Sequence, residues 1–160
     1  MKQYTVILAA LAVIAMPHFA FAAKATGNVQ VEADQMEIID TEQKTIFTGN
    51  VISTRPSETI KSDEMVVTNV DVKQPDGTLK SVTDKVNAKG NVVITTKTQT
   101  ITGTLAVFNV QANTLEVTGA VRVVQGTTNL TGNRLVVNLD NNHLQMTGGK
   151  ERVKANFVPK

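Results

Sequence analysis

The sequence predicts an all-β protein of antiparallel sheets, and three observations support that fold class. Apolar residues recur at every second position in several segments, which is typical of strands with one buried face. Valine and threonine are abundant, and their branched Cβ atoms favour strands over helices. Glycines recur at regular intervals, which indicates a repeated unit. Beyond the N-terminal region, no segment shows the sustained apolar period of an amphipathic helix.

The N-terminal segment of the 160-residue chain is predicted to be a cleavable secretory signal. Lys2 precedes an apolar stretch over residues 4–16, and the small-x-small sequence Ala20-Phe21-Ala22 follows it. The stretch is too short to cross a bilayer comfortably, and an uncleaved membrane anchor is the alternative. Because the sequence has no cysteine, we expect neither a lipoprotein anchor nor disulfides. We expect residues 1–22 to be removed and residues 23–160 to form one exported domain.

Four glycines mark the predicted repeat. Gly90, Gly119 and Gly148 lie 29 residues apart, whereas the interval from Gly49 to Gly90 is longer. The turn sequence Pro75-Asp76-Gly77 predicts an inserted hairpin or loop within that longer interval. The spacing therefore predicts about four strand–turn–strand repeats, with each glycine facing inward from a second strand. Such glycines mark bulges or bends, which would curve the sheet into a sandwich, jelly roll or solenoid.

The strands and turns follow from the alternation. In the first unit, Met36 and Ile38 alternate with polar residues, residues 40–44 form the turn, and Phe47 begins the returning strand. The third and fourth units are expected to turn near residues 109–113 and 140–143. These connections are rich in Asn and Asp, which suit tight hairpin turns.

The sequence predicts no catalytic, metal, cofactor or nucleic-acid site. After the signal, the only histidine is His143 in a predicted turn, and a zinc site would lack its usual ligands. The formal net charge is only +2 and aromatic residues are few, so nucleic acid is not an expected partner. The glycines lack the Lys-Ser/Thr pair of a phosphate loop. Basic residues near the C-terminus are expected to protect a sheet edge, with an anionic ligand or partner as the alternative: Lys150, Arg152, Lys154 and Lys160.

Five segments carry a family resemblance: VEADQMEIIDTEQKTIFTGNVIST (31–54), IKSDEMVVT (60–68), KGNVVITT (89–96), LTGNRLVVNLDNNHLQMTGG (130–149) and RVKANFVP (152–159). Their combination resembles the LptA/OstA-like family, periplasmic components of lipopolysaccharide export in Gram-negative bacteria. The most specific element is A-D-x-M followed by F-T-G-N-V.

The resemblance implies a twisted β-jelly-roll whose interior holds the acyl chains of lipopolysaccharide. It also implies head-to-tail stacking into a bridge that carries lipopolysaccharide from the inner-membrane exporter to the outer-membrane translocon. The implied partners are an LptC-like inner-membrane protein and the N-terminal domain of an LptD-like translocon.

We expect the lipid-facing residues to share the inward parity of the strands, although sequence parity alone cannot separate a groove wall from a closed core. The candidates are Met36, Ile38, Phe47, Val51, Met65, Val67, Val92, Ile94, Leu105, Val107, Leu115, Val117, Val121, Val123, Leu135 and Val137.

Two other classes of function compete with a lipid carrier. One is a structural or adhesive β-repeat protein with a dry core. The other is a β-solenoid enzyme acting on polysaccharide, which would need clustered inward-facing acids that the candidate faces lack.

Overall fold

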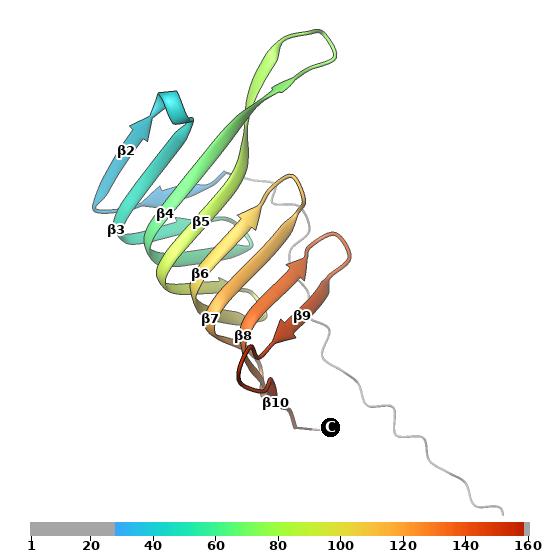
Figure 1. Ribbon diagram of the computed structural model, residues 1–160. Helices are drawn as coiled ribbons and strands as arrows, with labels where there is room; N and C mark the ends of the chain where they lie inside the picture. Colours follow the sequence, from blue (N-terminus) through green and yellow to red (C-terminus); the bar gives the residue numbers. More distant parts are fainter. Residues whose placement is uncertain (1–27, 159–160) are drawn as a thin grey trace, which may run out of the picture.

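The computed structural model describes residues 28–158 as one antiparallel sheet of ten strands (Figure 1). The strands are β1 (Gln30–Glu32), β2 (Gln35–Ile39), β3 (Lys44–Thr54), β4 (Glu58–Lys73), β5 (Leu79–Thr96), β6 (Thr100–Asn109), β7 (Thr114–Gln125), β8 (Thr128–Asn138), β9 (His143–Thr147) and β10 (Lys154–Asn156), with one 3-10 turn, η1 (Asp40–Glu42). The predicted all-β antiparallel fold is confirmed. The number of repeats stays a prediction, and the predicted signal at residues 1–22 lies outside the described residues.

Each strand from β3 to β8 pairs with the next along the chain, and two short strands complete each end of the sheet. At one end, β2 pairs with residues 44–48 of β3 and β1 pairs with residues 52–54. At the other end, β9 pairs with residues 134–138 of β8 and β10 with residues 129–131. The sheet thus has two halves, which we call the β2/β9 half and the β1/β10 half.

The two halves are separated by a line of β-bulges on alternate long strands, β3, β5 and β7. Three strands bulge at Gly49-Asn50, Gly90-Asn91 and Gly119-Ala120, where the pairing shifts register. Both residues of each pair have positive φ, from 77° to 83° at the glycine and 46° at the residue after it. Two successive left-handed residues turn a strand sharply, and glycine accepts this conformation without strain. The sheet therefore bends along the line of these three bulges, and the two halves face each other (Figure 1).

An aspartate covers each of the first two bulges, Asp34 from the link between β1 and β2 and Asp63 from β4. The Asn50 side chain donates a hydrogen bond to the Asp34 carboxylate, and Asn91 donates to Asp63, each at 2.8 Å. A Cβ atom on Gly90 would collide with the Asp63 carboxylate. The bulges therefore combine two requirements, a left-handed backbone and room for a neighbouring side chain.

The prediction of a fourth strand bend, at Gly148, is wrong. Strand β9 ends at Thr147, so Gly148 lies in a turn, where its carbonyl accepts a 3.1 Å hydrogen bond from the Glu151 amide. The left-handed residue here is Gly149, with φ of 65°, and it lies against Asn133. The difference arises because β9 stops after five residues and the chain turns away towards β10.

The predicted insertion is a hairpin that extends β4 and β5 beyond their neighbours (Figure 1). Its turn closes with a 2.7 Å hydrogen bond from the Gln74 amide to the Thr78 carbonyl. Asp76 accepts bonds from the hydroxyl and amide of Thr78, which lower the pKa of its carboxyl. Within residues 28–158 no helix is long and apolar enough to span a membrane.

A glycine-to-alanine pair tests the bulge. Gly90 and Gly77 have similar φ values of 77° and 85°, but nothing lies within 4 Å of a Cβ on Gly77. We expect Gly77→Ala to lower the free energy of unfolding by about 1 kcal/mol, from backbone strain alone. Gly90→Ala adds the collision with Asp63, so we expect a loss of about 2–4 kcal/mol in urea denaturation. Equal losses in the two variants would show that the close approach of Asp63 contributes nothing.

Candidate functional site

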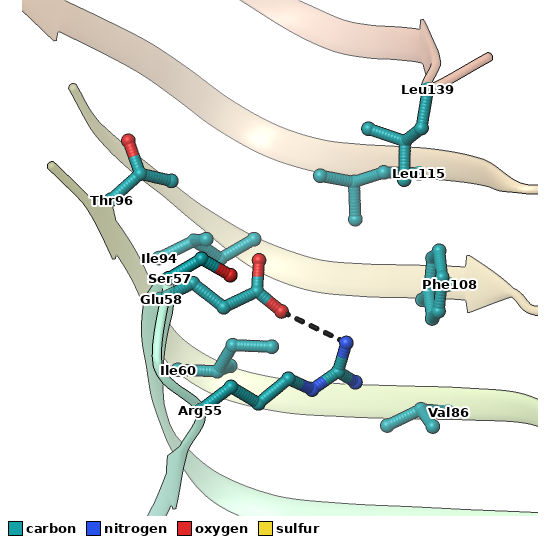
Figure 2. A pocket seen from close by; sticks show the side chains of 10 residues that line it. All are labelled: Arg55, Ser57, Glu58, Ile60, Val86, Ile94, Thr96, Phe108, Leu115 and Leu139. Carbon is teal, nitrogen blue, oxygen red and sulfur yellow. Dashed lines mark ion pairs between the residues drawn. The ribbon is translucent and has the colours of Figure 1, made fainter. Parts of the chain in front are cut away.

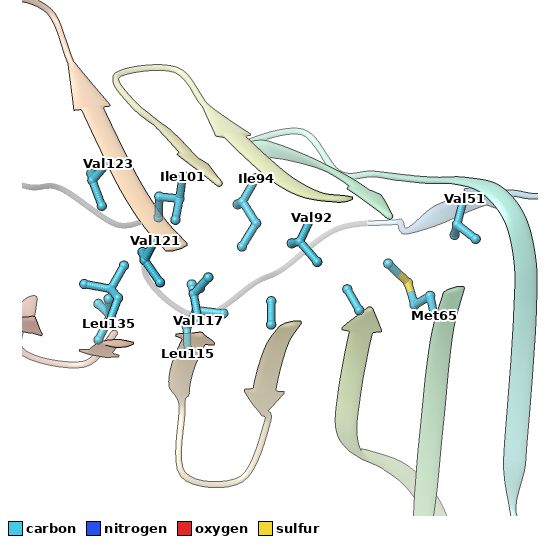
Figure 3. Packing of buried hydrophobic residues seen from close by; sticks show 13 residues of the cluster. Val51, Met65, Val92, Ile94, Ile101, Leu115, Val117, Val121, Val123 and Leu135 are labelled. Atoms are coloured by element: carbon cyan, nitrogen blue, oxygen red, sulfur yellow. The ribbon is translucent and has the colours of Figure 1, made fainter. Parts of the chain in front are cut away.

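The space between the two halves is filled by apolar side chains from both (Figure 3). Met65, Val117 and Leu135 come from the β2/β9 half, while Val92 and Val121 come from the β1/β10 half. All five are at most 1% exposed. Burial of aliphatic side chains from two facing layers provides the main stabilisation of such a fold.

Most of the predicted lipid-facing residues lie on this inner face. Those buried in the core are Val51, Met65, Val92, Ile94, Leu115, Val117, Val121, Val123, Leu135 and Val137. Phe47 is half-buried and packs against them. Val67 is also half-buried and pairs with Val86, which packs against the core. The structure carries no ligand contact, so lipid binding by these residues stays a prediction.

The inward placement predicted for Leu105 and Val107 is wrong. The buried residues of β6 are Ile101 and Ala106, and they lie five positions apart, so the inward parity of β6 changes opposite the bulges of β5 and β7. Leu105 pairs with Lys89 and Thr118, on the outer face. The prediction assumed that every second residue of β6 faces inward along its whole length. The pairing register shifts between Thr102 and Leu105, so this assumption fails there.

The inner face runs out into solvent at the β2 end. Met36 and Ile38 pair with Phe47 and Thr45 of β3, which places them on the inner parity. They are nevertheless 61% and 60% exposed, because no strand of residues 28–158 lies beyond β2 in this half of the sheet. An exposed apolar strand at a sheet edge is a surface that another chain can cover.

A small cavity of about 40 Å³ lies at the mouth, the side of the folded sheet opposite the bulges. One side of it is polar and comes from the β1/β10 half, with Arg55, Ser57 and Glu58 in and beside the β3–β4 turn. The other side is apolar and includes Phe108 and Leu115 of the β2/β9 half (Figure 2). This volume has room for a few water molecules only.

Arg55 reaches across the mouth from one half to the other. Its Nη1 atom lies 3.2 Å from Oε1 of Glu58, and its guanidinium carbon lies 5.7 Å from the centre of the Phe108 ring (Figure 2). The side chains of Arg55 and Glu58 are only 13% and 23% exposed. The sequence does not predict this cluster, because a turn arginine gives no sign of a partner 53 positions later in the chain.

The outer face carries a second ion pair, between β7 and β8. Arg134 donates from Nε and Nη2 to the two carboxylate oxygens of Glu116, at 2.7 and 2.9 Å. The guanidinium holds the pKa of the Glu116 carboxyl below its usual range, and the carboxylate raises the pKa of Arg134. Both side chains are well exposed, so this pair adds little stability. Residues 28–158 contain no cluster of His, Cys, Asp and Glu that could hold a metal ion.

The sequence and the fold are both similar to those of known proteins. The family described as "LptA/(LptD N-terminal domain) LPS transport protein" matches residues 30–142 and, in a second match, residues 100–158. The fold is similar to the crystal structure of LptH, the LptA homologous periplasmic component of the lipopolysaccharide transport device of Pseudomonas aeruginosa. That match has a TM-score of 0.69 and 14% sequence identity, and covers 86% of this chain and 100% of the other. No curated protein matches the sequence.

The neighbours Leu135 and Val136 test whether the inner face is the core. Leu135 is fully buried, whereas Val136 is half-buried on the outer face between Glu116 and Gln145. We expect Leu135→Ala to lower the free energy of unfolding by about 2–5 kcal/mol. For Val136→Ala we expect less than about 1 kcal/mol. Urea denaturation measures both, and a larger loss at Val136 would contradict the assignment of the faces.

Proposed function

Because the chain belongs to the family of LptA and LptD N-terminal domains, which are lipopolysaccharide transport proteins and not enzymes, we propose that it carries lipopolysaccharide between the two halves of its folded sheet. In this proposal the acyl chains lie along the inner face, and the protein is one unit of a bridge between the inner-membrane exporter and the outer-membrane translocon. The predicted signal at residues 1–22 would direct the protein to the periplasm.

One observation carries this proposal: a row of inner-face side chains crosses every paired strand from β2 to β9. The row follows the strand register directly and consists of Met36, Phe47, Met65, Ala88, Ala106, Val117, Leu135 and Met146. Every member is apolar, so an acyl chain lying across the strands would meet no polar group along this row. A continuous apolar track suits a ligand that slides, because apolar contacts are non-directional.

Entry of lipid requires the two halves to separate, since the cavity at the mouth is only about 40 Å³. Acyl chains would replace one set of apolar contacts by another, at roughly 0.8 kcal/mol for each buried CH₂ group. That gain offsets the loss of direct packing between the halves. The methionines of the row are unbranched and adapt their shape to a new neighbour.

The two ends of the sheet support head-to-tail stacking. Beyond β1 and β2 at one end, and beyond β9 and β10 at the other, no strand of residues 28–158 follows. Free edges of this kind pair with another chain, and unlike ends give an open filament. The β2 end is acidic, with Glu32, Asp34 and Glu37, whereas the β10 end is basic, with Lys150, Arg152 and Lys154. Opposite charges favour unlike ends as neighbours.

The same edges would receive the neighbouring components of the bridge. We assign an LptC-like protein and an LptD-like N-terminal domain to the two ends, in addition to further copies of this chain. Each would extend the antiparallel sheet by backbone hydrogen bonds, as in strand addition generally.

A structural role without cargo is the second candidate, and the close packing between the halves favours it. Several core side chains are fully buried, and the cavity beside them is small. Lipid binding separates the two functions, because a dry structural core takes up no lipid.

Lipid binding is tested with Phe47 and its neighbour Thr48. Phe47 lies on the inner face, whereas Thr48 is exposed and pairs with Glu64 on the outer face. We expect purified residues 23–160 to bind lipopolysaccharide. Phe47→Glu should reduce binding at least about tenfold, because a buried carboxylate among acyl chains is strongly disfavoured. Thr48→Glu should bind normally. Circular dichroism confirms that both variants are folded, and equal binding by both would contradict the proposed position of the lipid.

Stacking is tested by light scattering over a series of protein and salt concentrations. We expect the mean mass to rise with protein concentration and to fall with salt, because exposed charges are screened beyond about 8–10 Å at physiological salt. Lys154→Glu on β10 should shorten the stacks, and mixing it with Glu37→Lys should restore them. Lys89→Glu in the middle of the sheet serves as the control. A monomer at every concentration would contradict the edge-pairing proposal.

A further inference from the structure

The mouth of the folded sheet combines a cation, an aromatic ring and an apolar interior in one place. Arg55 and Glu58 are the two charged residues around the cavity, and both belong to the β1/β10 half. The apolar residues opposite them, Phe108 and Leu115, belong to the β2/β9 half (Figure 2). A ligand at this place would have its apolar part inside the fold and its polar part against Arg55.

Arg55 has hydrogen-bonding capacity that the protein leaves unused. Its salt bridge to Glu58 engages Nη1, whereas Nε is buried and has no hydrogen-bond partner in the part of the chain that the structure describes. A buried donor without a partner is destabilising, because it has lost its hydrogen bonds to water. The guanidinium is held in place by the Phe108 ring at 5.7 Å and by Glu58. Arg55 is therefore a positioned donor, with one buried N–H group available for an acceptor.

The polar rim continues from Glu58 along the neighbouring strands. Glu58 pairs with Thr96, and the Thr96 amide donates a 2.9 Å hydrogen bond to the Gln99 carbonyl. Gln99 is only 4% exposed, yet neither Nε2 nor Oε1 of its side chain has a hydrogen-bond partner among residues 28–158. Buried polar groups in proteins are almost always satisfied. Unused side-chain donors thus occur in Arg55, which lines the cavity, and in Gln99, which lies in the turn after Thr96 and does not itself line the cavity.

We propose that Arg55 binds a phosphate group on the headgroup of an acylated lipid, with the acyl chains extending inward past Phe108. This inference rests on the proposed lipid-carrier function and adds a headgroup site to it. The planar guanidinium forms paired hydrogen bonds to phosphate oxygens, and these bonds strengthen in a partly buried site. Glu58 competes with the phosphate for Arg55, which keeps the binding reversible, as transfer between successive carriers requires.

A purely structural role for the cluster makes a different prediction from a phosphate site. If Arg55 and Glu58 only join the two halves, removing either charge weakens the fold and lowers lipid binding. If Arg55 binds phosphate, the two substitutions act in opposite directions. Arg55→Gln removes the donor, whereas Glu58→Gln removes the competing carboxylate.

The experiment compares two lipids with identical acyl chains, bisphosphorylated lipid A and its dephosphorylated form, in equilibrium binding to residues 23–160. We expect the wild-type protein to bind the bisphosphorylated form roughly tenfold more tightly, the effect of one charge-assisted contact. Arg55→Gln should abolish this preference and leave binding of the dephosphorylated form unchanged. Glu58→Gln should increase the preference. Inorganic phosphate, added in excess as a competitor, should weaken the binding of the bisphosphorylated lipid only. This result distinguishes a site for the lipid's phosphate from a site for a free anion.

The control is Lys61→Gln, which removes an exposed cation from the outer face of β4 and should leave both affinities as in the wild type. Arg55→Lys keeps the charge without the planar fork and should retain part of the preference. Thermal unfolding identifies any variant that is not folded, and Glu58→Gln tests the site if Arg55→Gln is unfolded.

The outcomes separate the headgroup site from the carrier function. Equal wild-type affinity for both lipids overturns the phosphate site and leaves the carrier function standing. If Arg55→Gln lowers the affinity for both lipids to the same extent, the phosphate site is overturned in favour of a structural role. Binding of neither lipid by the wild-type protein overturns the carrier function and the site together.

Discussion

The whole structure depends on pairs of left-handed residues on β3, β5 and β7, which bend the sheet along one line. At Gly49-Asn50, Gly90-Asn91 and Gly119-Ala120, a glycine and the residue after it both take positive φ. Without this bend a sheet of this composition would be flat, with one apolar face open to water. The bend places the two halves of the same strands against each other, so a single sheet supplies both layers of the core. The folded sheet therefore has three regions: a core between the halves, a mouth opposite the bend, and two open ends.

The proposed activity uses these three regions for different purposes. The core supplies an apolar track that acyl chains can share, because dispersion and hydrophobic contacts do not depend on the identity of the apolar partner. The ends carry unlike charges and free backbone groups, and these favour an open stack over a closed dimer. The mouth holds the charged pair of Arg55 and Glu58 beside Phe108. In this proposal, lipid is held at both its apolar and its polar part without a rigid preformed pocket.

Much of the fold could be predicted from the sequence, because period-two alternation is a local signal. In β7, for example, the buried residues Val117, Val121 and Val123 all share one parity. The Gly119-Ala120 bulge preserves the inward parity of this strand. In β6 the parity changes between Ile101 and Ala106 instead. Four successive apolar residues, from Leu105 to Phe108, leave the inward parity undetermined in the sequence. The inward placement of Leu105 and Val107 was wrong for that reason.

The parts that could not be predicted depend on contacts between distant segments. Arg55 meets Phe108 only because the sheet folds back on itself, and no local pattern encodes that meeting. Gly148 has the same spacing as the other glycines, but β9 ends at Thr147, so Gly148 lies outside a strand. The exposure of Met36 and Ile38 likewise depends on their position at the last strand, which parity does not reveal.

The most direct test of the central claim is site-specific photo-crosslinking of lipopolysaccharide in living Gram-negative cells. A photoreactive phenylalanine analogue is introduced at Ile94, which is buried on the inner face, or at its exposed neighbour Thr95. If lipid travels between the two halves of the sheet, adducts form at position 94 and not at position 95. Adducts at position 95 alone, or none at position 94 in a correctly folded and exported protein, would contradict the account.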